Sequence, residues 1–280
     1  MNDQALQLRQ MTAQVVVEAE PTPPKPVYVV GSGKGGVGKS VVAVLVAQAM
    51  AESGRRVLLV DGSQNLGHLH VLLGVAIDAR LEQVLRGEVE PAQLVCQVSE
   101  GLWLLPSDSG AESLYALPAV DQARLHHRLL ALYDDFDVVV VDAGPGVETA
   151  VRLATMGGTK LLVVTVPEVS ALTDAYALIK LVHAQLPTLP IDVLVNRAVA
   201  PEEVDQAFDR LAIAADRFLG RTLQSVGGLT ETGALRNTMR RPGGILSDPQ
   251  LADLRREVRE LAALLPAAES PAAVATGGTP

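Results

Sequence analysis

The sequence predicts a doubly wound α/β fold, in which helices cover both faces of a mostly parallel sheet. Three observations predict it. Short apolar runs typical of strands alternate with longer segments of helical periodicity. The run Phe136–Asp142 is almost continuously apolar, as expected of a strand covered on both faces. A glycine-rich loop, Gly33–Ser40, separates the first such strand from the first helix.

The loop Gly33-Lys34-Gly35-Gly36-Val37-Gly38-Lys39-Ser40 has the spacing of a phosphate-binding P-loop. Its backbone N–H groups would surround the phosphates, and the helix that follows would add the positive end of its dipole. Glycines allow the close approach that side chains would block. In this motif Lys39 reaches the β- and γ-phosphates, and the Ser40 hydroxyl ligates Mg²⁺. We therefore expect a nucleoside triphosphate and Mg²⁺ as ligands.

The other strands and helices are predicted from the periodicity of apolar residues and from the residues that interrupt it. Besides Phe136–Asp142, the predicted strands are Val27–Val30, Val57–Asp61, Leu102–Leu105, Lys160–Val166, Ile191–Asn196 and Leu223–Val226. The main predicted helices are Val41–Glu52, Ala119–Tyr133, Ser170–His183, Pro201–Leu219 and Glu231–Arg241. Residues 27–246 would form the nucleotide-binding domain.

Composition limits the class of protein. The chain has 280 residues, of which 48% are hydrophobic, so it can bury one substantial core. A net charge of −9 disfavours nucleic acid as a partner. The single cysteine, Cys96, excludes an intrachain disulfide and favours a reducing cytoplasm. No apolar run approaches the roughly 18 residues that indicate a membrane span, so we expect a cytoplasmic protein.

A second lysine in the loop indicates a family. Lys34 directly follows the first glycine, and this arrangement resembles the deviant Walker A signature of the MinD/ParA family of ATPases. In that family the additional lysine reaches the phosphates bound by the partner subunit. The resemblance implies a homodimer bridged by ATP, with Lys34 and Lys39 among the catalytic residues.

The segment after Val57–Asp61 resembles switch I of that family, usually DADLGLANxDVLLG. Asp61 fits the pattern, but the second aspartate, which orients the attacking water and supports Mg²⁺ in the family, falls on Ser63. Serine carries no charge to polarise a water. Because phosphoryl transfer depends on positioning and electrostatics, we expect this loss to cost about 3 kcal/mol, or about a hundredfold in rate. The prediction is ATP binding with slow or negligible turnover.

Two histidines, His68 and His70, lie one residue apart in the same segment. Their spacing is compatible with a pair of metal ligands. No nearby cysteine or carboxylate completes a coordination shell, so we expect exposed side chains of the switch loop.

Two later strands end in further candidate residues. Asp142-Ala143-Gly144-Pro145-Gly146 resembles Walker B and switch II of the family, usually DTGAG. There Asp142 would hold the hydration shell of Mg²⁺, and the Gly144 amide would sense the γ-phosphate; the alternative for Asp142 is a helix N-cap. Asn196-Arg197 matches the family's VNR, in which the asparagine amide reads the adenine edge; the alternative is ordinary turn chemistry.

The N-terminus carries a motif for a partner. We expect a short helix at residues 1–15 on a proline-rich tether at 16–26, with a disordered leader as the alternative. The start of the chain resembles the DQAxxLR activator motif of FlhG flagellar regulators, which are MinD relatives; its matching residues are Asp3, Gln4, Ala5, Leu8 and Arg9. In that family the motif docks on the GTPase FlhF, and its glutamine completes GTP hydrolysis. Thr173–Lys180 also resembles the TDAYALIK stretch of FlhG proteins.

The C-terminal part, residues 247–265, has a narrow apolar stripe formed by Leu251, Leu254, Val258, Leu261 and Leu265. In the family a C-terminal amphipathic helix binds the membrane when ATP drives dimerisation. This segment has balanced charges and no aromatic anchors. Two alternatives stay open: peripheral contact with the cell membrane, or packing on the domain or on a partner. We expect residues 266–280 to be a disordered tail.

These resemblances imply an ATP-dimerising regulator of flagellar number or placement that stimulates FlhF. One alternative is a non-hydrolysing, ATP-bound scaffold for flagellar switch proteins or a flagellar transcription regulator. Another is a ParA-like partitioning ATPase, which the acidic charge disfavours. An iron-protein-type reductase needs two bridging cysteines per subunit, and Cys96 alone cannot supply them.

Overall fold

The computed structural model describes residues 25–63, 67–79, 83–84, 86–107, 128, 130–241 and 244–265. All of them belong to the larger of the two units into which the chain divides, Lys25–Ala267. The predicted activator motif and the C-terminal tail lie outside the described residues, as does most of the predicted helix Ala119–Tyr133.

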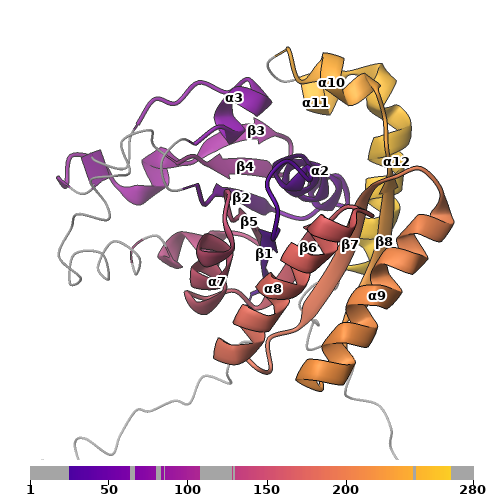
Figure 1. The fold of residues 1–280 in the computed structure, drawn as a ribbon. Coiled ribbons are helices and arrows are strands. Elements are labelled where there is room, and N and C mark those ends of the chain that lie inside the picture. The colour runs from indigo at the N-terminus through magenta and orange to yellow at the C-terminus, as the bar shows by residue number, and fades with distance from the viewer. Residues whose placement is uncertain are drawn as a thin grey trace, which may run out of the picture. The chain divides into compact units, whose positions relative to one another are not determined.

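Within the described residues, one sheet of eight strands has the order β3-β4-β2-β5-β1-β6-β7-β8 (Figure 1). Every neighbouring pair is parallel except β3 and β4. The strands are β1 (Val27–Gly31), β2 (Val57–Asp61), β3 (Cys96–Ser99), β4 (Leu102–Leu105), β5 (Val138–Asp142), β6 (Lys160–Thr165), β7 (Ile191–Ala198) and β8 (Gln224–Thr230). The predicted doubly wound, mostly parallel fold is confirmed.

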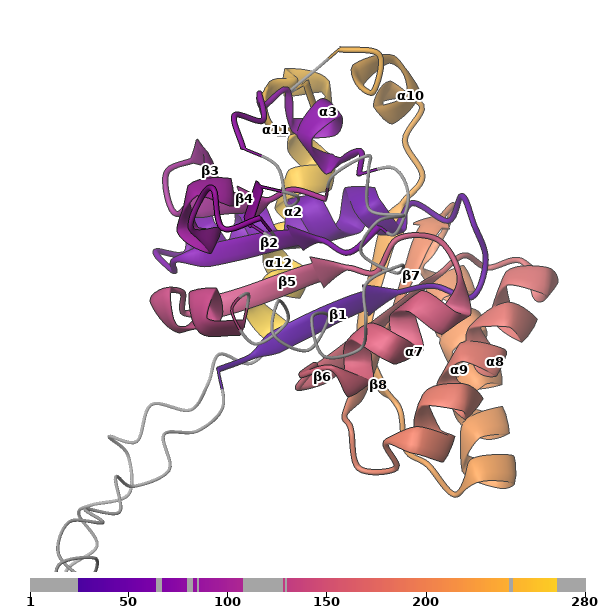
Figure 2. The ribbon, with the colours of Figure 1, turned by 90° about the vertical axis from the view of Figure 1, so that its left-hand side faces the viewer.

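Helices cover both faces of this sheet (Figure 2). One apolar core lies under α7 (Val147–Thr155), α8 (Val169–Gln185) and α9 (Pro201–Leu219). The other lies under α2 (Lys39–Glu52), α3 (Leu69–Leu73), α11 (Gly244–Ser247) and α12 (Ala252–Leu264). In β5, Val139 and Val141 belong to the first core and Val138 and Val140 to the second. Successive strand residues point to opposite faces, so this apolar run feeds both cores.

Several elements differ from the prediction. The antiparallel edge strand β3 was not predicted, because its side chains are mostly half-buried and show no apolar run. Helix α7 was missed as well. The predicted helix Glu231–Arg241 is shorter: α10 spans only Ala234–Thr238. Short 3₁₀ turns lie at η1 (Pro91–Leu94), η2 (Tyr133–Asp135) and η3 (Pro249–Leu251).

The last strand extends beyond the predicted end at Val226 and includes Gly227 and Gly228. Gly227 has a φ of +98° beside a shift in the β7–β8 register, which marks a bulge. A Cβ atom on Gly228 would lie 2.3 Å from Cγ2 of Val204 on α9. These glycines therefore allow a bend in β8 and the close approach of α9.

The predicted C-terminal amphipathic helix corresponds to α12, which packs on the domain. Leu254, Val258 and Ala262 are buried in the same core as α2. Nη1 of Arg259 lies 3.2 Å from the Glu52 carboxylate at the end of α2. Of the two alternatives given for the apolar stripe, the structure shows packing of α12 on the domain. No helix of the described ranges combines the length and hydropathy needed to cross a bilayer.

We predict that the inner face of α12 contributes to stability and that its outer face does not. Leu254 is 7% exposed and Leu264 is 65% exposed on the same helix. Leu254→Ala should lower the free energy of unfolding by about 2 to 4 kcal/mol, because it removes buried methyl groups. Leu264→Ala should change it by less than about 0.5 kcal/mol. Urea unfolding measures both, and equal effects would contradict the packing described above.

Candidate nucleotide-binding site

The P-loop lies at the centre of the sheet. It leaves the carboxyl end of β1, which lies between β5 and β6, and it leads into α2. Val30 of β1 pairs with Asp142 of β5, and the amide of Ala143 donates to the Val30 carbonyl at 3.0 Å. The sheet therefore brings the loop and the predicted Walker B aspartate to one edge, where open α/β sheets bind ligands.

Two glycines let neighbouring elements close on the loop. A Cβ atom on Gly33 would lie 2.0 Å from the carbonyl oxygen of Asp174 in α8. Gly38 has a φ of +88°, and a Cβ there would lie 2.4 Å from Nδ2 of Asn196. That Asn196 nitrogen donates to the Val37 carbonyl at 2.7 Å. The loop is thus held between α8 and the end of β7.

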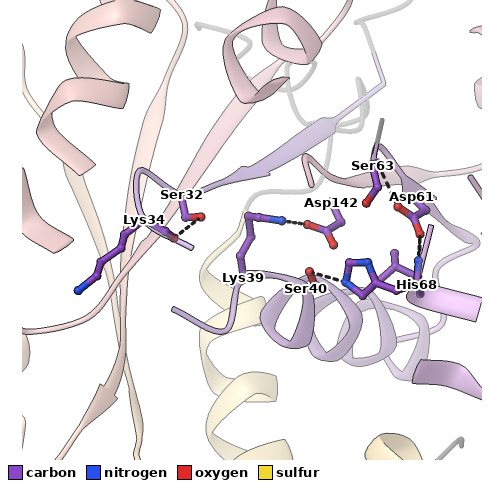
Figure 3. Close-up of polar contacts among 9 residues, drawn as sticks. Ser32, Lys34, Lys39, Ser40, Asp61, Ser63, His68 and Asp142 are labelled. Carbon is purple, nitrogen blue, oxygen red and sulfur yellow. Dashed lines mark hydrogen bonds and ion pairs between the residues drawn. The ribbon is translucent and has the colours of Figure 1, made fainter. Parts of the chain in front are cut away.

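A buried ion pair joins the loop to β5. Nζ of Lys39 pairs with Oδ1 of Asp142, whose side chain is 0% exposed (Figure 3). Oδ2 of Asp142 is buried and has no hydrogen-bond partner among the described residues. A buried carboxylate oxygen without a partner is costly. Together with the Ser40 hydroxyl on the first turn of α2, this oxygen fits the hydration shell of Mg²⁺.

Asp61 anchors switch I. Its Oδ1 accepts the amide of Ser63 at 3.1 Å, and its Oδ2 accepts the amides of His68 and Leu69 at 3.0 and 3.1 Å. The carboxylate therefore fixes both ends of the loop and the start of α3. The catalytic role predicted for Asp61 from the sequence stays a prediction; the contacts of its carboxylate hold the neighbouring backbone.

The two switches meet at Ser63. A Cβ atom on Gly144 would lie 2.9 Å from Cα of Ser63. The Ser107 hydroxyl donates to the Ser63 carbonyl at 2.7 Å, which holds the backbone from the other side. The Ser63 hydroxyl is buried and has no hydrogen-bond partner within the described part of the chain. Ser63 therefore presents an uncharged side chain with an unused hydrogen-bonding group, at the position predicted to correspond to the second aspartate of switch I.

A cavity of about 560 Å³ opens over the P-loop, and this volume is in the range of small-molecule sites. Its lining includes Lys39, Ser40, Ser63 and His68. Pro145 of the predicted switch II also lines it, as do Thr149 and Met239, which sequence reasoning did not assign to the site. Thr149 lies in the unpredicted α7 and Met239 just after α10, so no motif identified them.

Lys34 points away from this cluster (Figure 3). Its Nζ lies 2.7 Å from the Glu168 carboxylate and 2.9 Å from the Ser170 hydroxyl, where α8 begins. This hydrogen bond and the lysine charge lower the pKa of Glu168 from its ordinary value. Arg197 has a φ of 59° and pairs with Glu231 at 2.8 Å. Neither Lys34 nor Arg197 lines the cavity.

Comparisons with known proteins agree with this geometry. Residues 26–189 match a family profile described as an AAA domain. The antiactivator FleN of Pseudomonas aeruginosa is 34% identical over 218 residues, which are 78% of each chain. The chain belongs to the FlhG branch of the MinD/ParA ATPases.

Other members of the family resemble it as well. The flagellum site-determining protein YlxH of Helicobacter pylori is 29% identical over 75% of this chain and 71% of its own length. The crystal structure of the cell division ATPase MinD of Pyrococcus furiosus superimposes with a TM-score of 0.68 at 25% identity, over 86% of this chain and 98% of that one. The MinD-like architecture therefore extends well beyond the matched profile.

Proposed function

We propose that this MinD-like flagellar regulator binds ATP with Mg²⁺, dimerises around the nucleotide, turns it over slowly and activates an FlhF-type GTPase. The observation that carries the proposal is the P-loop held against Asp142 by Lys39, at the central edge of the sheet. The named functions of two relatives, the antiactivator FleN and the site-determining YlxH, support a role in flagellar number or placement.

ATP binding would use groups that lie around the P-loop. The loop amides and the start of α2 would receive the phosphates. Lys39 would exchange its contact with Asp142 for the phosphates, and the Asn196 amide would contact the adenine. Ser40 and Asp142 would hold Mg²⁺, which when bound offsets the negative charge of the phosphates.

Slow turnover follows from the chemistry of Ser63. Its hydroxyl is available to hydrogen-bond a water, but it brings no negative charge. The backbone around it is held by Asp61 and Ser107, so the loss concerns charge rather than placement. This is the basis for weak hydrolysis with ATP binding retained.

We predict that Ser63→Asp raises the rate of ATP hydrolysis by about a hundredfold, because it restores a carboxylate at the position of the attacking water. Ser63→Asn introduces a side chain of about the size of aspartate but without its charge, so it should leave the rate near that of the wild type. The measurement is phosphate release under saturating ATP, with equilibrium ATP binding as the control. A wild-type rate that Ser63→Asp does not increase would contradict the assigned role of Ser63.

One observation favours a second candidate function. A protein that keeps ATP as a permanent structural ligand has no need of a charged residue to activate water, and Ser63 is uncharged. The chain would then act as a non-hydrolysing scaffold that presents binding surfaces to flagellar switch proteins or to a flagellar transcription regulator. Wild-type turnover below detection, with tight ATP binding, would favour this alternative.

Dimerisation would require Lys34 to leave Glu168. Both side chains are substantially exposed, so solvent screens their ion pair and its contribution to stability is small. The pair is therefore easily exchanged for the phosphates of a second subunit. In the free subunit, Glu168 and Ser170 hold the lysine at the start of α8.

We predict that Lys34→Ala abolishes the ATP-dependent dimer, since it removes the cation that would contact the partner's phosphates. Glu168→Gln should keep or increase the dimer fraction, because it weakens the contact that holds Lys34. Sedimentation velocity with Mg²⁺ and either ATP or ADP measures both. Equal dimerisation of wild type and Lys34→Ala would exclude the proposed bridge.

The N-terminal segment supplies the proposed link to the GTPase. Residues 1–15 would be the activator and residues 16–26 its tether. We predict that Gln4→Ala lowers the stimulation of FlhF GTP hydrolysis at least tenfold, because the glutamine would complete that active site. Gln7→Ala, at an unspecified position of the same motif, should retain stimulation. GTP turnover of FlhF with each full-length variant measures this, and a fully active Gln4→Ala protein would refute it.

A further inference from the structure

His68 occupies a defined position in the cavity over the P-loop. Its backbone amide is held by Oδ2 of Asp61 at 3.0 Å, immediately before α3. Its ring nitrogen Nε2 lies 3.2 Å from Oγ of Ser40, the hydroxyl proposed to ligate the cation (Figure 3). The side chain is exposed, as predicted, but it is directed at the cation site rather than away from the protein.

Nε2 of His68 and Oγ of Ser40 are about as far apart as two neighbouring ligands of one metal ion. Neighbouring ligands of an octahedral ion with bonds of about 2.1 Å lie about 3.0 Å apart. In the tautomer with its proton on Nδ1, Nε2 has one lone pair, which accepts the Ser40 hydroxyl here and would have to be released to bind a metal ion. Across the site, Oδ2 of Asp142 is buried and has no described partner.

The donor set differs from that of an oxygen-only magnesium site. Mg²⁺ prefers oxygen ligands and keeps several waters, whereas a nitrogen ligand favours first-row transition-metal ions, least for Mn²⁺ and more strongly for Co²⁺ and Ni²⁺. Ser63, which also lines the cavity, offers a buried hydroxyl without a described partner and no anionic oxygen. His68 adds a nitrogen close to the same hydroxyl.

We propose that His68 is a nitrogen ligand of the cation bound with the nucleotide, and that it shifts the preference of the site from Mg²⁺ toward Mn²⁺ and Co²⁺. This inference rests on the proposed nucleotide site. A merely structural histidine would stabilise Ser40 or α3 but would not change which cation binds. Cation preference and metal–nitrogen coupling therefore separate the two roles.

The test uses the full-length chain with ADP and Mn²⁺, so that no turnover is involved. Pulsed electron paramagnetic resonance should detect a ¹⁴N nucleus coupled to Mn²⁺ in the wild type and in His70→Ala, the matched control from the same segment. The coupling should be absent in His68→Ala and in His68→Asn, which keeps a polar side chain. Competition binding should show the Mn²⁺-over-Mg²⁺ preference falling about tenfold in both His68 variants.

Two negative results have different meanings. If the wild type binds Mg²⁺–ADP but shows the same ¹⁴N signal and cation preference as both His68 variants, His68 is not a ligand and this inference alone fails. If the wild type binds no nucleotide with any cation, the proposed function fails together with it. Thermal unfolding of the two variants verifies that each is folded before the comparison is made.

Discussion

The buried ion pair between Lys39 and Asp142 is the interaction on which the rest of the site depends. Each charge alone in this position would cost several kcal/mol of desolvation. The pair forms because β1 and β5 are neighbours in the sheet and end at the same edge. It ties the first turn of α2 to switch II, so a ligand that attracts Lys39 also releases an oxygen of Asp142. Under the proposed function, phosphate binding and cation binding would therefore be coupled through this one contact.

The segments around this pair combine a firmly held backbone with an uncharged side chain at Ser63. Asp61 keeps both ends of switch I in place, and Ser63 contacts Gly144 without adding a charge. A substitution at a held position changes what the site can do without changing where its atoms lie. At Ser63 the backbone is held by Asp61 and Ser107, and the side chain brings no charge.

The elements and site residues that could be predicted from the sequence are those marked by a pattern within a few neighbouring residues. The P-loop, the strand that ends at Asp142 and most other strands depend on spacing and apolar runs within a few residues. The contacts of Lys34 with Glu168 and of His68 with Ser40 join positions 134 and 28 residues apart, and no local pattern encodes such pairs. The predicted last strand ended at Val226, whereas β8 continues through Gly227 and Gly228, which allow a bulge and the packing of α9.

The packing of α12 on α2 has a consequence for how the chain is made. Proteins are synthesised from the N-terminus at roughly 5 to 20 residues per second. The core under α7, α8 and α9 involves residues up to Leu223, whereas the core around α2 also needs Leu251–Leu265. Helix α2 therefore emerges early, and the part of its apolar face that α12 covers can be buried only after Leu251–Leu265 have been synthesised.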